Sequence, residues 1–158
     1  KNMIDFVKLI HLVAAIFWMG GMAFMLLALR PAAVALLQPP ERLMLMGGVW
    51  KRFFPVVLVS IVALFTTGTN LYTTAFRAMK AATGQGAVPL GWNVMLVLAL
   101  LMMVIFGYFY WVAYAKFKRA MAVQDWPLAG KAAAQVHTWT VINFALGWLA
   151  IAAVRLVR

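Results

Sequence analysis

The chain has 158 residues, of which 66% are hydrophobic and 11% charged, so its composition excludes a water-soluble domain and indicates an integral membrane protein. It has no cysteine, which excludes disulfides and thiolate metal ligands. The 14 Lys and Arg against 3 Asp and Glu give a net charge of +11. These charges lie in short connections beside apolar stretches, so we expect them to set membrane topology and to contact anionic lipid headgroups rather than nucleic acid.

Four apolar stretches predict an all-α integral membrane protein, a four-transmembrane-helix bundle that forms one transmembrane domain over residues 1–158. We expect its helices at about residues 4–29, 53–75, 92–117 and 129–156.

The first apolar stretch, Leu9–Leu29, contains a histidine, which membrane segments seldom carry without a function. At 100° per residue, one side of this helix carries His11, Ala15, Trp18, Met22 and Met25. The pair Gly20-Gly21 lets a neighbouring backbone approach beside that side. An imidazole and thioether stripe of this kind suits a soft metal ion or a haem, and it also suits a packing face with one hydrogen-bonded histidine.

The next connection is basic, and between Arg30 and Arg42 we expect a short amphipathic piece at the membrane interface. The second helix is expected to carry Pro55 in its first turn, where a missing N–H costs nothing. That helix ends in the polar run Thr66–Asn70, and a solvated turn follows at 82–89.

The third helix begins with Trp92-Asn93-Val94-Met95 and ends in an aromatic run before a polar connection. Asp125 followed by Pro127 predicts the cap that opens the last helix.

Loop charges predict the topology. The first and third connections share one side and carry eight basic residues: Arg30, Arg42, Lys51, Arg52, Lys116, Lys118, Arg119 and Lys131. The termini and the middle connection carry six: Lys1, Lys8, Arg77, Lys80, Arg155 and Arg158. Since basic loops favour the cytoplasm, we expect a multi-pass protein of a bacterial inner membrane with both termini in the periplasm.

Depth in the membrane decides which polar groups can share a site. His11 lies near the outer end of the first helix, whereas His137 lies toward the inner side, so a haem held between them is disfavoured. His137 is expected at the interface, hydrogen-bonded or near lipid phosphate. Better-placed companions for His11 are Asn70, Asn93 and Met95.

Two cofactors fit these donors. A copper ion would take His11 with the thioethers of Met22, Met25 and Met95 as ligands, because soft thioethers favour Cu(I). Haem b would use His11 as axial ligand, with Met95, Asn93 and Asn70 beside it. The sequence contains no paired carboxylates, phosphate loop or Ser/His/Asp set, so we predict no catalytic residue of a hydrolase or transferase; an oxidoreductase role requires the haem.

The chain resembles the CopD copper-resistance family of bacterial inner-membrane proteins, in its short single-domain branch. The matching motifs are Lys8-x-x-His11-x6-Trp18-x-Gly20-Gly21, Leu29-Arg30-Pro31-Ala-Ala, Pro39-Pro40-Glu-Arg42-Leu, Arg52-Phe53-Phe54-Pro55 and the stretch from Lys118 to Gly130. The resemblance covers nearly the whole chain and implies copper uptake or tolerance.

The first-helix pattern is also similar to HemJ-type protoporphyrinogen oxidases, which hold haem b through a first-helix histidine. The resemblance implies that His11 is the matching haem ligand. Where those proteins carry His-x-Lys at the start of the third helix, this chain has Asn93-Val94-Met95, and the missing lysine argues against porphyrinogen oxidation.

Three functions therefore compete: copper handling of CopD type, a b-type haem redox protein, and a structural accessory subunit of a larger membrane complex. The expected partners are the lipid bilayer and either further copies of the chain or a larger membrane complex, with no nucleic acid.

Overall fold

The computed structural model describes residues 2–157, and Lys1 and Arg158, which enter the charge count above, lie outside the described residues. Within this range the chain forms four long helical segments: Asn2–Leu36, Pro39–Thr83, Leu90–Ala122 and Trp126–Leu156. Each is long and apolar enough to cross a membrane. The predicted all-α four-helix membrane bundle is confirmed.

Two of the four segments contain a π-helical turn. The first segment consists of α1 (Asn2–Phe24), the π turn η1 (Met25–Leu29) and α2 (Arg30–Leu36). The third consists of α4 (Leu90–Tyr108), the π turn η2 (Phe109–Tyr114) and α5 (Ala115–Ala122). The others are the uninterrupted helices α3 (Pro39–Thr83) and α6 (Trp126–Leu156).

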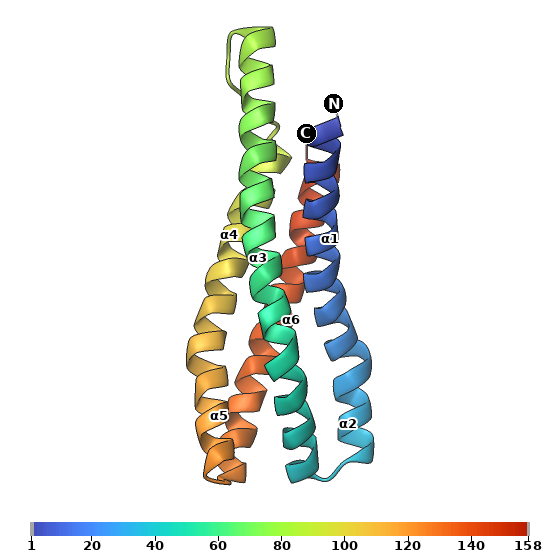
Figure 1. Ribbon diagram of the computed structural model, residues 1–158, viewed down its shortest axis with the longest axis vertical. Helices are drawn as coiled ribbons and strands as arrows, with labels where there is room; N and C mark the ends of the chain where they lie inside the picture. The colour runs from blue at the N-terminus through green and yellow to red at the C-terminus, as the bar shows by residue number, and fades with distance from the viewer. Residues whose placement is uncertain (1, 158) are drawn as a thin grey trace.

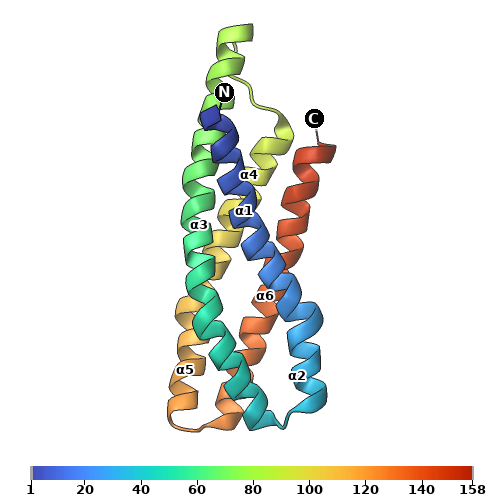
Figure 2. The ribbon, with the colours of Figure 1, turned by 45° about the vertical axis from the view of Figure 1, so that its right-hand side comes forward.

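The segments run alternately up and down, with α1 packed on α3 and α4 packed on α6 (Figures 1 and 2). The start of α1 and the end of α6 lie at one end of the bundle, here called the terminal end. The α2–α3 and α5–α6 connections lie at the other, here called the basal end. The last turns of α3 project beyond the other helices at the terminal end (Figure 1).

At the basal end the helices extend well past the predicted boundaries. The segment expected as a basic connection is helical: α2 continues α1 to Leu36, and α3 begins at Pro39 rather than near residue 53. A capping box formed by Gln38 and Glu41 opens α3, and a proline in its first turn needs no N–H partner. Pro55 therefore lies inside a continuous helix rather than in a first turn.

This extension leaves the charged residues on helices instead of loops. At 1.5 Å per residue, the basal parts of the helices reach up to about 20 Å beyond the apolar spans. These parts are residues 39–52 and 115–122, α2 and the first turns of α6. A set of basic side chains, here called the basic belt, adjoins the ends of these spans: Arg30, Lys51, Arg52, Lys116, Lys118 and Arg119. Ends of apolar spans lie at the level of lipid headgroups, so we expect the belt to lie at the basal membrane interface.

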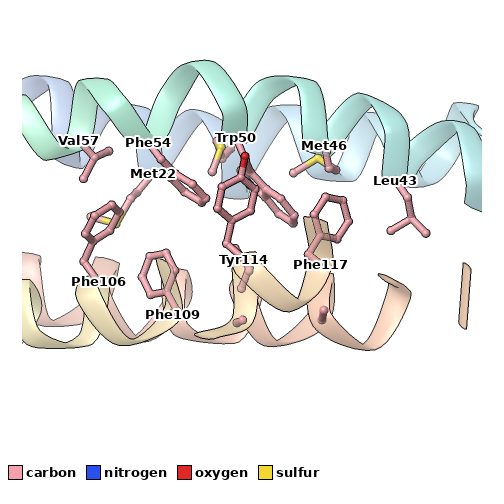
Figure 3. Packing of buried hydrophobic residues seen from close by; sticks show 14 of the residues in the cluster. Met22, Leu43, Met46, Trp50, Phe54, Val57, Phe106, Phe109, Tyr114 and Phe117 are labelled. Carbon is pink, nitrogen blue, oxygen red and sulfur yellow. The ribbon is translucent and has the colours of Figure 1, made fainter. Parts of the chain in front are cut away.

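The core is an aromatic cluster between α3 and the third segment (Figure 3). The ring of Phe54 lies 5.8 Å from that of Phe106 and 4.8 Å from that of Tyr114, both in edge-to-face geometry. Trp18 of α1 meets Phe106 at 6.3 Å, which ties the first helix to the cluster.

One fully buried side-chain amide links α6 to α4. The side-chain nitrogen of Asn143 donates to the carbonyl oxygen of Met102 at 3.1 Å. Polar contacts of this kind between helices help to fix their register in a membrane.

Candidate functional site

The imidazole of His11 is held by a hydroxyl of α3. Its Nδ1 lies 2.8 Å from Oγ1 of Thr67, and the same hydroxyl donates to the carbonyl oxygen of Ala63 one turn earlier. A threonine hydroxyl has one proton, so when it donates to Ala63 it accepts from His11, and Nδ1 carries the hydrogen. Nε2 is then left with its lone pair, which is the form in which histidine binds a metal.

Gly68 allows the close approach of α1 and α3 at this position. A Cβ atom at residue 68 would lie 3.2 Å from Cε1 of His11, tighter than ordinary contacts. The glycine next to Thr67 therefore gives the ring its place against α3, and Thr67 fixes the ring's rotation.

The other polar residues predicted near His11 are engaged elsewhere. The hydroxyl of Tyr72 donates to Oδ1 of Asn93 at 2.7 Å, and Nδ2 of Asn93 donates to the carbonyl of Val88 at 3.4 Å. Asn70 is exposed, and Met95 is half-buried on α4, which packs on α6. The structure therefore pairs Asn93 with Tyr72 and places neither Asn70 nor Met95 in a hydrogen bond with His11.

The predicted methionines of the first segment lie in the core. Met22 is 2% exposed and Met25 is 5% exposed, on the inward face that also carries Trp18. At 1.5 Å per residue, Met22 lies about 16 Å and Met25 about 21 Å along the helix from His11. One metal ion bonds ligands at about 2 Å, so His11 does not share an ion with either methionine.

Methionine side chains instead lie at successive levels of the core, from the middle of the bundle toward its basal end. A Cβ on Gly147 of α6 would meet the sulfur of Met19 and lie 3.2 Å from the methyl group of Met102, so both side chains crowd this point. Farther along come three buried methionines of α1, η1 and α3. We name these five residues the thioether series: Met19, Met102, Met22, Met25 and Met46.

The series ends at a cavity of about 570 Å³ that is lined by η1, α2 and the basal parts of α3 and α6, here called the basal cavity. Met25 and Met46 form part of its apolar wall, and Arg30, Arg42 and His137 form a basic part. The two histidines therefore lie toward opposite ends of the bundle, since His137 lines the basal cavity together with Arg30 and His11 lies outside it.

Trp50 is a feature of this cavity that sequence reasoning missed. Its ring is stacked on Phe54 at 6.1 Å and meets Phe117 edge-on at 5.0 Å (Figure 3). It is 2% exposed and lines the basal cavity, yet its indole N–H has no hydrogen-bond partner among the described residues. The sequence offers no signal for this, since a tryptophan before Lys51 is equally typical of an interfacial anchor.

The side chains that could bind a metal fit a cofactor that needs one strong protein ligand at the terminal end. Within residues 2–157, no three His, Asp or Glu side chains come together as a metal cluster. His11 offers one oriented imidazole nitrogen, and thioethers at the core offer soft, weaker donors. These residues suit Cu(I) or haem iron, and they do not suit Zn²⁺, Mg²⁺ or Ca²⁺, which need three or more nitrogen or oxygen ligands.

The fold and these features define a four-helix membrane protein with an oriented histidine on its first helix. Comparison with known protein families, with characterised proteins and with solved structures finds no match.

Proposed function

We propose that the protein handles copper in a bacterial inner membrane in the manner of the CopD family, with His11 as the entry ligand. The observation that carries this proposal is the His11–Thr67 hydrogen bond of 2.8 Å, which leaves the Nε2 lone pair free to bind a ligand. Metal-binding histidines typically donate their other N–H to a fixed oxygen, which sets the tautomer and the ring orientation.

The thioether series supports copper rather than a harder metal. Met22, Met25, Met46 and Met102 are buried, and Met19 packs against Gly147 at the middle of the bundle. Thioethers bind Cu(I) and have little affinity for hard cations, so these side chains give the ion soft contacts between His11 and the basal cavity. Met95 is proposed as an auxiliary ligand from the third segment.

Haem b is the second candidate, favoured by the isolation of His11. Haem iron needs only one protein ligand, and His11 is the one imidazole near the terminal end. When bound, haem would supply one-electron transfer. The role of the chain would then be to hold the iron through Nε2 and to fix the ring through Thr67.

An absorption spectrum and a metal analysis of the purified protein separate these functions. Copper at about one equivalent without a Soret band supports copper handling, and a Soret band with iron supports the haem protein. A preparation that binds neither, after exposure to Cu(I) and to haemin, would contradict both and leave the accessory subunit.

Substitution of the two histidines tests the site itself. His11→Ala should abolish stoichiometric binding of the cofactor, whereas His137→Gln, the matched change at the opposite end, should leave the content near wild type. Met95→Leu should weaken binding or shift a haem spectrum without abolishing it. Full cofactor content in His11→Ala would show that His11 only packs against α3.

A further inference from the structure

The basal cavity has a positive lining that the protein does not neutralise. Arg30 and Arg42 are half-buried and line it, yet neither guanidinium forms a salt bridge or hydrogen bond with another residue of the described range 2–157. The nearby carboxylates are used as helix caps: Glu41 accepts from the backbone N–H of Gln38, and Asp125 accepts from that of Leu128. Unneutralised, partly buried arginines favour an anionic ligand.

Trp50, another residue that lines the cavity, gives a second and independent observation. The indole N–H of Trp50 is buried and has no partner there, although buried donors in proteins are nearly always satisfied. Its ring is fixed by Phe54 and Phe117, so the N–H cannot turn to another acceptor. A ligand oxygen that reaches the indole from the cavity, after a small movement of the lining side chains, would complete this donor.

The position of the cavity identifies the kind of anion. Arg30 belongs to the basic belt, which lies at the ends of the apolar spans, so the polar part of the cavity lies at headgroup level. On the membrane side of Arg30 the wall of the cavity is apolar and includes Met25 and Leu26. A volume of about 570 Å³ lies within the usual range for small-molecule sites, roughly 300–1,000 Å³. A ligand with an anionic head and an apolar body matches this lining.

We propose that the basal cavity binds the phosphate headgroup of an anionic phospholipid. Arg30 and Arg42 would bind the phosphate oxygens, with His137 beside them, and the N–H of Trp50 would donate to an oxygen of the head or glycerol. The acyl chains would leave past Met25 and Leu26, on the side of the cavity that faces the apolar spans. This site is separate from His11, and its test does not depend on the copper or haem proposal.

The test uses the full-length protein in detergent and two lipids with identical acyl chains. Native mass spectrometry measures the retention of dioleoyl phosphatidylglycerol and of dioleoyl phosphatidylcholine, which carries the same phosphate with a cation attached. We expect wild type to retain the anionic lipid about tenfold better, because a choline cation is repelled by the arginines. Equal retention of the two lipids would overturn the proposal, and this comparison needs no substitution.

Three variants locate the site. The double change Arg30→Gln/Arg42→Gln should remove the preference. Trp50→Phe, which keeps one aromatic ring and removes the N–H with the pyrrole part of the indole, should weaken retention several-fold. Lys51→Gln is the matched control, since it removes a charge from the exposed face of the same end of α3. If the control loses as much as the double variant, general surface charge explains the binding and the site is excluded.

Inorganic phosphate distinguishes the two sources of the anion. We expect equimolar phosphate to leave phosphatidylglycerol bound, because the apolar wall binds only the lipid. Displacement of the lipid at that concentration would overturn the lipid assignment and identify a free oxyanion as the ligand.

Discussion

The hydroxyl of Thr67 determines which nitrogen of His11 is free. It accepts from Nδ1 while donating to the carbonyl of Ala63, so Nε2 keeps its lone pair. If this contact orients the imidazole toward a ligand, its loss should weaken the binding of the cofactor without abolishing it. That expectation separates an orienting threonine from one that only packs.

Thr67→Val should lower the affinity for copper, or for haem if haem is bound, by about 10- to 100-fold, the usual effect of losing an outer-shell partner of a metal-binding histidine. The reason is that valine has the same shape but accepts no hydrogen bond. A competition titration against a Cu(I) chelator, or a haemin titration followed by absorbance, measures the change.

Thr67→Ser is the control for that measurement, because serine keeps the hydroxyl and loses only a methyl group. We expect it to restore most of the affinity. Equal affinities of the valine variant and wild type would show that Thr67 has no part in ligand orientation.

Part of this site was predictable from the residues and part was not. Because an imidazole in a membrane span requires a partner, Asn70, Asn93 and Met95 were the predicted companions of His11. The hydrogen bond observed is instead with Thr67, in the same polar run as Asn70. The partner of Asn93 was not predictable, because the rotation of α4 that turns it toward Tyr72 depends on packing against α6. Trp50 was missed for the same reason, because the burial of its N–H without a hydrogen-bond partner depends on how the segments pack around it.

At the scale of the helices, α4 and α6 approach closely at Gly91. A Cβ there would collide with the carbonyl oxygens of Ala153 and Val157, which are backbone atoms that cannot rotate away. Gly20 on α1 offers the contrast, because a Cβ there meets nothing within 4 Å. The two glycines therefore predict opposite effects of the same substitution.

Gly91→Ala should destabilise the bundle by about 1–3 kcal/mol, the usual cost of overpacking, because the start of α4 must move away from the end of α6. Gly20→Ala should be neutral or slightly stabilising, since alanine favours a helix by about 1 kcal/mol over glycine. Thermal unfolding in detergent, followed by circular dichroism, compares them. A loss in Gly20→Ala equal to that in Gly91→Ala would contradict the packing of α4 on α6.

The helices themselves were predictable in number and only in part in extent. Apolar length identified all four, and the Asp125 cap of α6 is confirmed by its bond to the N–H of Leu128. The basal extension was not foreseen because Pro31, Pro39 and Pro40 resemble helix breakers. In the structure Pro39 and Pro40 occupy the first turn of α3, where the missing N–H costs nothing, and Pro31 directly follows the π turn η1 within the continuous first segment.

At the scale of the whole molecule, the distribution of charge bears on its orientation in the membrane. The basal end carries the basic belt together with Arg42 and Lys131, whereas the described part of the terminal end carries only Lys8, Arg77, Lys80 and Arg155. Arg77 and Lys80 lie on the projecting turns of α3, which lengthen that helix beyond its neighbours (Figure 2). Basic residues close to the spans favour retention on the cytoplasmic side.

We therefore expect the basal end in the cytoplasm and the terminal end in the periplasm. Alkaline phosphatase, which is active only in the periplasm, should be active when inserted between Gly84 and Gly86 or fused after α6. Green fluorescent protein at those two places should stay dark after export. Matched insertions at the basal connections, between Leu37 and Gln38 or at Gln124, should give the opposite readings, because those connections lie at the other end of every helix. Phosphatase activity at the basal connections would show that the molecule has the opposite orientation, with the lipid-binding cavity in the outer leaflet.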